Sequence, residues 1–169
     1  MISAELNYLT RSLPTYLITD QEYSRIESAK PTARVIICKG EMGLEFDPDP
    51  SRHPKLPYDQ IVRKNIARGV RYQWISQDTE KNKIRADIIR KLFPADSARV
   101  SLLNGKEWQE LPFSLETVFI TTILNGSEKV DAYLQIPVED LEAERYWIKV
   151  DPDRRDEWQG RAARYMNGI

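Results

Sequence analysis

The chain has 169 residues, of which 41% are hydrophobic and 30% charged, and its 25 Lys and Arg residues nearly balance its 26 Asp and Glu residues. These values are ordinary for a globular domain and exclude collagen-like, disordered and disulfide-framework proteins. No apolar run is long enough to cross a membrane, no signal peptide is visible, and the single cysteine, Cys38, cannot form an internal disulfide. We therefore expect a cytoplasmic protein without a membrane partner.

The first residues are predicted to be helical and polar. We expect one domain over residues 1–169, with residues 1–32 as a helical N-terminal extension. Thr19-Asp-Gln-Glu22 has the form of a capping box, in which each end residue bonds the backbone of the other. Pro31 ends this segment.

The next part of the chain predicts alternating strands and helices. A short apolar run rich in β-branched residues, typical of a strand buried on both faces, is followed by a proline-rich loop over residues 46–57. Gly69 stands where a helix is expected to end. We predict strands over residues 33–38, 70–75 and 99–103, and helices over residues 58–68 and about 79–93. The second helix is expected to bury Ile84, Ile88, Ile89 and Leu92. This order indicates a parallel sheet.

The second half of the chain predicts antiparallel structure. Residues 116–124 and 130–136 are expected to form a hairpin through Asn125-Gly126-Ser127, with a loop longer than the tightest type. A further strand over residues 146–150 and a final helix over residues 153–167 complete the chain. The predicted fold class is α/β, a mixed sheet with parallel core strands and an antiparallel C-terminal hairpin, covered by helices.

The charge is distributed unevenly. Residues 63–91 contain nine Lys and Arg residues against three acids, whereas residues 128–157 contain ten acids against five bases. The basic segment is predicted to form two solvated helix faces, and the alternative is a patch for phosphate, nucleic acid or protein. The acidic part could pair with a basic face within the chain or in a homo-oligomer.

The single histidine lies in His53-Pro-Lys55-Leu-Pro-Tyr-Asp59. This segment is similar to the phospholipase D signature, in which the histidine is the nucleophile and the lysine holds the phosphate. Here Asp59 is one place early and prolines flank both other residues, so we favour an exposed loop histidine. The alternative is a phosphodiesterase or nuclease in which a dimer supplies two histidines. A lone histidine also disfavours a Ser-His-Asp triad and a multi-histidine metal centre.

Three further features have weaker functional interpretations. Cys38 ends a strand beside Lys39 and is predicted to be a buried small residue rather than a reactive thiol. The aspartates of the proline-rich region (Asp47, Asp49 and Asp59) fit turns better than a cation site, so no metal is expected. Trp108 lies in a polar loop and is a candidate for the wall of a pocket or an interface.

The segment Asn65-Ile-Ala-Arg68-Gly69-Val-Arg-Tyr72 resembles the helix-to-strand junction of bacterial regulatory domains of the phospholipase D-like superfamily. In that pattern the glycine ends the helix tightly and the tyrosine begins the second strand. The resemblance is clearest over residues 33–94 and extends loosely to the C-terminal helix. Many such domains lack the catalytic histidine and lysine. The resemblance therefore implies a sensory or effector module here.

The sequence therefore predicts a non-catalytic regulatory or ligand-sensing domain. Ligands of open parallel sheets bind at the carboxyl ends of the strands, and these ends are followed here by Lys39, Glu41, Gln77 and Asp78. We expect these four residues to line a pocket for a small-molecule or nucleotide effector, without a cofactor, in a homo-oligomer. The alternatives are the phosphodiesterase and a nucleic-acid or protein interaction module built on residues 63–91.

Overall fold

A computed structural model describes residues 17–53, 58–112, 115–137 and 145–166. Its strands are β1 (Leu17–Thr19), β2 (Thr32–Cys38), β3 (Arg71–Gln77), β4 (Ala98–Leu103), β5 (Thr117–Leu124), β6 (Ser127–Gln135) and β7 (Tyr146–Lys149). The helices are α2 (Asp20–Glu27), α3 (Tyr58–Ala67), α4 (Glu80–Leu92), α5 (Gly105–Gln109) and α6 (Pro152–Met166). Short 3₁₀ turns, η1 (Leu44–Phe46) and η2 (Pro50–Arg52), interrupt the predicted proline-rich loop.

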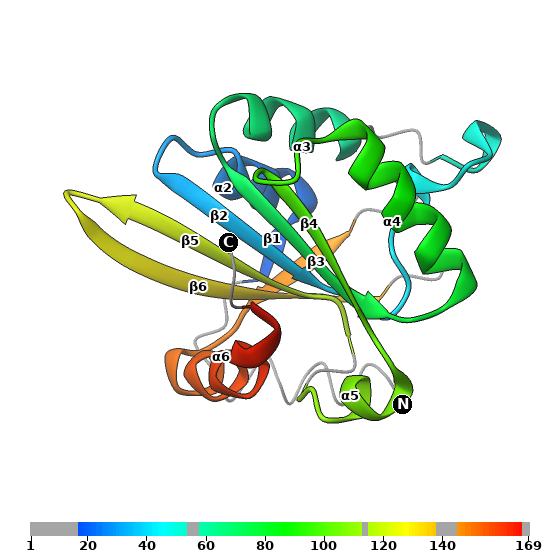
Figure 1. The fold of residues 1–169 in the computed structure, drawn as a ribbon. Coiled ribbons are helices and arrows are strands. Elements are labelled where there is room, and N and C mark those ends of the chain that lie inside the picture. Colours follow the sequence, from blue (N-terminus) through cyan, green and yellow to red (C-terminus); the bar gives the residue numbers. More distant parts are fainter. Residues whose placement is uncertain (1–16, 54–57, 113–114, 138–144, 167–169) are drawn as a thin grey trace.

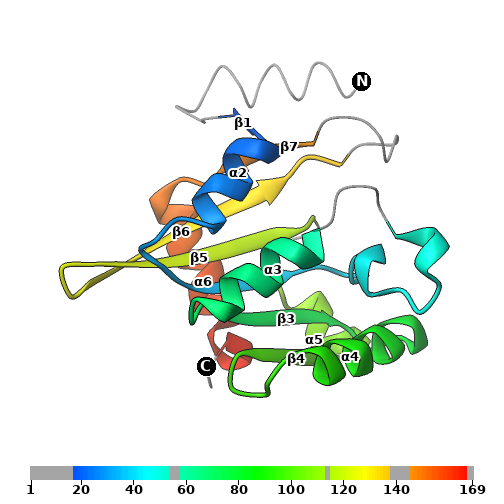
Figure 2. The ribbon, with the colours of Figure 1, turned by 90° about the horizontal axis from the view of Figure 1, so that it is seen from above.

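All strands belong to one mixed sheet in the order β1-β7-β6-β5-β2-β3-β4. The prediction of an α/β fold with a parallel core is confirmed, because β2, β3 and β4 are parallel neighbours joined by helical crossovers. Helices α2, α3 and α4 cover one face of the sheet, and α5 and α6 lie on the other (Figure 1). The view from above shows the first three helices side by side over that face (Figure 2).

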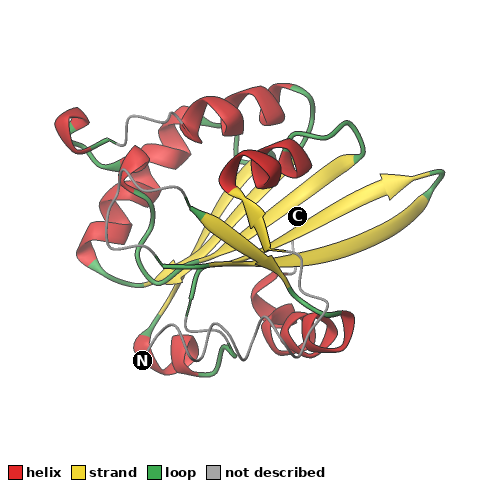
Figure 3. Ribbon diagram, turned by 180° about the vertical axis from the view of Figure 1, so that it is seen from behind, coloured by secondary structure: helices red, strands yellow, loops and turns green. Residues whose placement is uncertain are grey.

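The antiparallel half begins at β5, which returns along the other side of β2. The hairpin of β5 and β6 is confirmed, but its loop is shorter than predicted. Leu124 pairs with Ser127, which leaves a turn of Asn125 and Gly126, with φ angles of 52° and 78°. Positive φ at both positions is what the tightest hairpin turn requires, and Asn-Gly tolerates it. The hairpin tip projects beyond the neighbouring strands (Figure 3).

The N-terminal region is helical only in part. Residues 1–16 lie outside the described residues, and Leu17–Thr19, predicted helical, instead form β1, which pairs antiparallel with β7. These residues form a strand rather than a helix because the backbone of β7 has an edge with which they can pair. The predicted capping box is confirmed: the Glu22 amide donates to Thr19 Oγ1 at 3.2 Å, and the Thr19 amide donates to the Glu22 carboxylate at 2.8 Å.

Each face of the sheet has its own hydrophobic core. The core beneath α2, α3 and α4 includes Tyr23, Val62, Tyr72, Trp74, Ile89 and Trp147. The opposite core, beneath α5 and α6, includes Ile36, Cys38, Ile75, Phe119, Ala132 and Ala162. Alternate residues of each central strand therefore serve opposite cores, as the pleat requires. No helix in the described part of the chain is long and apolar enough to cross a membrane.

The buried face of α4 differs from the predicted one. Ile89 is buried as expected, but Ile84 is 49% exposed and Leu92 is 41% exposed. Asn82 and Arg85 are buried in their place. These two polar residues face the protein interior because they form hydrogen bonds with the loop that follows β2. The spacing of apolar residues along the helix does not indicate these contacts with a distant loop.

Candidate functional site

The four predicted ligand-binding residues lie at the carboxyl ends of β2 and β3. Lys39 and Glu41 follow β2, Gln77 ends β3, and Asp78 begins the connection to α4. Backbone hydrogen bonds hold these segments together, since the Lys39 amide donates to Ile75 at 3.0 Å and the Gln77 amide donates to Gly40 at 3.3 Å. The structure thus brings the four positions to one end of the sheet.

A single buried side chain links the two loops. The Asn82 amide group donates to the carbonyls of Gly40 and Gln77, both at 2.8 Å, and its Oδ1 accepts from the Met42 amide at 2.9 Å. Asn82 stands in the first turn of α4, whose N-cap is Thr79. The start of α4 therefore sets the separation of the β2 and β3 loops.

Arg85, one turn further along α4, fixes the rest of the β2 loop. Its side chain is 1% exposed and reaches Glu41 Oε1 and Asp47 Oδ2, each at 3.0 Å, and the Met42 carbonyl. Hydrogen bonds from the Asp49 amide and from Arg85 lower the pKa of Asp47. A buried guanidinium with several acceptors is a rigid anchor, so the loop is held in one conformation.

Charged side chains at these carboxyl ends are paired with one another. Glu41 also lies 3.8 Å from Lys81, and Asp78 lies 3.4 Å from Lys83. Lys39 Nζ lies 2.7 Å from Glu116 Oε2, so these two side chains form an ion pair. The site is close to electrically neutral.

Gly40 lies beside these residues and leaves room for a Cβ atom. A Cβ atom at Gly40 would meet Trp108 Cζ2 at 3.7 Å and Gln77 Oε1 at 3.9 Å, which is ordinary contact. Trp108 was predicted to lie in a polar loop, but it belongs to α5, which a capping box between Asn104 and Glu107 begins. Its ring packs against the core beneath α5 and α6. The indole and the Gln77 amide oxygen thus lie next to the position that a side chain at Gly40 would take.

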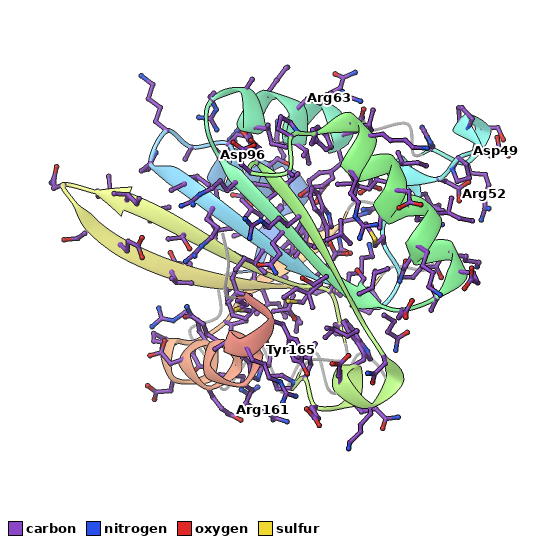
Figure 4. All side chains as sticks on the ribbon, viewed as in Figure 1. Asp49, Arg52, Arg63, Asp96, Arg161 and Tyr165 are labelled. Carbon is purple, nitrogen blue, oxygen red and sulfur yellow. The ribbon has the colours of Figure 1, made fainter. Side chains whose placement is uncertain are left out.

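His53 lies on the loop that projects past this site, next to η2. The side chains of Asp49 and Arg52 mark this loop (Figure 4). His53 is exposed, and its Nε2 lies 2.7 Å from the Asp47 carbonyl, to which the protonated nitrogen donates. Lys55 lies outside the described residues. One ring nitrogen of His53 is therefore engaged with the main chain of its own loop.

The other candidate groups do not converge. Asp47 binds Arg85 and Arg52, Asp49 caps η2 by accepting from the Ser51 amide, and Asp59 lies 3.6 Å from Arg63. Among the residues that the structure describes, no three His, Cys, Asp or Glu side chains are grouped to hold a metal ion.

Cys38 is fully buried in the second core, as predicted. Burial raises the pKa of its thiol well above the ordinary value, so the thiolate that would be needed for reactivity is disfavoured.

The basic segment 63–91 is largely neutralised by neighbouring acids. Five of its cations form ion pairs with carboxylates, and they come from both helices: Arg63, Lys81, Lys83, Arg85 and Arg90. The remaining four, Lys64, Arg68, Arg71 and Lys91, have no carboxylate partner among the described residues. The segment is therefore not one continuous basic surface.

A second buried polar network, which the sequence did not reveal, lies under the amino ends of β2 and β3. Glu27 Oε1 accepts from Tyr72 at 2.5 Å and from Tyr58 at 2.9 Å. Asn65 donates to the Tyr72 hydroxyl at 2.8 Å and accepts from Arg68 at 2.6 Å. Glu27 is fully buried, and desolvation raises its pKa despite the phenol hydrogen bonds, which lower it.

This network explains the motif that resembles the phospholipase D-like junction. Asn65, Arg68 and Tyr72 are joined by hydrogen bonds, and Gly69 adopts a φ of +92° that ends α3. The only sequence signal for Glu27 is a carboxylate at the end of an otherwise amphipathic helix, which by itself does not distinguish it from a surface acid.

Comparison with known proteins adds no identification: no family model matches the chain, and no curated protein matches it.

Proposed function

We propose that this chain is a non-catalytic regulatory domain that senses a polar small molecule at the carboxyl ends of β2, β3 and β4. One observation carries the proposal: Asn82 ties the loops after β2 and β3 together, so Lys39, Glu41, Gln77 and Asp78 are presented from a fixed frame. A preorganised frame lowers the entropy loss on binding. The position agrees with the rule for ligands of open parallel sheets.

The chemistry of the site favours a ligand with both donors and acceptors. Lys39 supplies an ammonium, Glu116 the carboxylate that is paired with it, and Gln77 an amide beside Gly40. Because the acids and bases of the site nearly cancel, a zwitterion or a nucleotide held by its base fits better than a bare polyanion. His53, bonded to its own loop, supports binding rather than hydrolysis.

The test is a thermal-shift screen with the twenty amino acids and the ribonucleoside mono- and triphosphates. We expect at least one compound to raise the thermal midpoint. Two site variants should abolish the shift. Gly40→Leu places a larger side chain against Trp108 and Gln77, and Gln77→Ala removes the amide. Gly160→Leu is the matched control, since nothing lies near Gly160 on α6. No shift with any compound, or a shift that survives in both site variants, contradicts the proposal.

We also propose kinship with the phospholipase D-like regulatory domains. The support is the Asn65-to-Tyr72 segment, which acts as one hydrogen-bonded unit between a helix and the second parallel strand. An experimental structure at high resolution, superposed on members of that superfamily, tests this kinship. A different order of strands in those members would contradict it.

Self-association is the remaining part of the proposal. Ile84 and Leu92, eight residues apart on the outer side of α4, are exposed, and Ile88 between them is partly exposed. Such a stripe at helical spacing suits a second copy of the same helix. Sedimentation velocity should give a dimer that Ile84→Asp dissociates, and a monomer at all concentrations would contradict it.

A further inference from the structure

The amino ends of the parallel strands carry a group of cations that we call the amino-end patch: Lys30, Arg34, Lys64, Arg68, Arg71 and Arg99. Arg34 and Arg71 are register partners on β2 and β3, and Arg99 on β4 pairs with Gln73, two residues after Arg71. Neighbouring strands lie about 4.8 Å apart, so the three arginines are close neighbours. These three arginines point to the face opposite α3, because Val35, Tyr72 and Ala98 belong to the core beneath it, whereas Lys64 belongs to α3 and Arg68 follows it. The amino-end patch therefore extends around the end of the sheet, with cations on both of its faces.

No member of the amino-end patch has a carboxylate partner among the described residues, in contrast to the cations at the carboxyl ends. Arg34 Nε donates to Thr121 Oγ1 at 3.4 Å, Arg68 donates to Asn65 Oδ1 at 2.6 Å, and Arg99 Nε donates to the Ala95 carbonyl at 3.5 Å. These acceptors are neutral. The guanidinium groups are thus oriented by the fold, but their charge is not compensated.

Few acids oppose this charge. Asp96 lies in the loop before β4 at this end of the sheet (Figure 4) and is exposed. Glu27 lies beneath the patch, where it is fully buried among phenol hydroxyls. Like charges held side by side repel one another unless an external anion compensates them. The patch therefore has the electrostatics of an anion site, although the whole chain is close to neutral.

The shape of the patch favours an extended anion over a compact one. Its residues come from three strands, a helix and a loop. On the α3 side the patch includes a hollow of about 570 Å³, which is open and is lined by Ser28, Ile61, Lys64, Asn65, Ala67 and Arg68. Small ligands prefer enclosed pockets, whereas a chain of phosphates spans a broad surface. The arginine fork also matches phosphate oxygens in geometry.

We propose that the amino-end patch binds the sugar-phosphate backbone of duplex nucleic acid without reading its bases. The described aromatic side chains are all buried or partly buried, and none belongs to the patch or lines its hollow, so the patch itself offers no stacking platform of the kind that single strands require. This inference does not rest on the ligand site at the opposite ends of the strands. The proposed surface also differs from the basic segment 63–91 of the sequence. It excludes the paired cations of α4 and includes Arg34 on β2 and Arg99 on β4, which lie outside that segment.

The test is fluorescence anisotropy with a labelled duplex of about 20 base pairs at increasing salt. We expect binding at low salt that weakens steeply as salt rises, and equal affinity for a duplex of shuffled sequence. The triple variant Arg34→Gln, Arg71→Gln, Arg99→Gln should bind about tenfold more weakly or worse, with a salt slope smaller by about 3.

The matched control removes three cations that already have acid partners: Lys83→Gln, Arg90→Gln and Arg161→Gln. It changes the net charge by the same amount, and its affinity should stay within about twofold of the parent. Equal weakening in both triple variants, or no binding at low salt, overturns the proposal. Displacement of the duplex by inorganic triphosphate at the same phosphate concentration also overturns it, in favour of a small polyphosphate ligand. Circular dichroism of both variants separates lost binding from lost folding.

Discussion

The two ends of the parallel strands are built around different kinds of buried polar network. At the carboxyl ends, Arg85 is buried as an ion and its charge is matched by Asp47 and Glu41. At the amino ends, Glu27 is buried among phenol hydroxyls with its pKa raised by desolvation. In the first network the charges are paired with one another and hold a loop. In the second network the charge of Arg68 has no carboxylate partner among the described residues. One end of the sheet is therefore preorganised, and the other is electrostatically open.

This difference bears directly on where each ligand class can bind. Under the proposed function, a polar small molecule at the carboxyl ends would exchange partners with groups such as Lys39 and Glu116, which are already paired with one another. A phosphate chain at the amino ends meets cations with only neutral partners, such as Arg34 and Arg99. The ion pairs therefore distinguish the charged side chains that have a carboxylate or cation partner within the fold from those that have only neutral partners.

The largest effect on stability is expected from Arg85→Met. This change leaves the buried Asp47 carboxylate with only the exposed Arg52, and breaking one side of a buried ion pair costs about 3–5 kcal/mol. Urea unfolding should show this loss. The control Arg90→Met removes an exposed pair with Asp87 and should change the free energy of unfolding by less than about 0.5 kcal/mol. Equal effects of the two changes would mean that the carboxyl-end network does not hold the loop.

A smaller and pH-dependent effect is expected from Glu27→Gln. Because the folded-state pKa of Glu27 lies above its ordinary value of 4.5, the protonated form favours the fold. Its contribution is fully present below about pH 4.5 and is lost as pH rises through the folded-state pKa. The neutral glutamine removes this titration, so the variant should gain stability relative to the parent as pH rises from 4.5 to 8. Chemical unfolding at several pH values measures both curves, and parallel curves would contradict the raised pKa of Glu27.

The sequence predicts well those features that depend on neighbouring residues. The Thr19 capping box, the end of α3 at Gly69 and the Asn125-Gly126 hairpin each rest on local hydrogen bonds or on backbone freedom. The parallel core follows from apolar strands that alternate with amphipathic helices. All four of these predictions concern interactions within about ten residues or a regular repetition along the chain.

The features that sequence reasoning missed depend on distant partners. Asn82 and Arg85 form hydrogen bonds with a loop about 40 residues earlier in the chain. The hydrophobic periodicity of α4 predicts burial of Ile84 rather than Arg85, and this is wrong because those distant contacts bury the other face. Glu27 is buried because Tyr58 and Tyr72 reach it from α3 and β3. The location of Lys39, Glu41, Gln77 and Asp78 at one end of the sheet follows from the predicted strands, but their ion pairs could be seen only in the three-dimensional structure.

The smallest effect, Gly69→Ala, tests the junction that places Arg68. Gly69 has a φ of +92° and nothing within 4 Å of an added Cβ, so the cost is backbone strain rather than a clash, and about 1–2 kcal/mol is expected. Gly160→Ala is the control, because a glycine within α6 without a positive φ should gain up to about 1 kcal/mol from the same change.

Urea unfolding of the two alanine variants should therefore give shifts of opposite sign. If Gly69→Ala is as mild as Gly160→Ala, the end of α3 can rearrange without loss, and the hydrogen-bond chain from Glu27 through Tyr72 and Asn65 to Arg68 is not what orients that arginine. A shift of the expected sign means that the left-handed turn and the buried network act together. The position of Arg68 at the amino ends is then set by the fold of this junction.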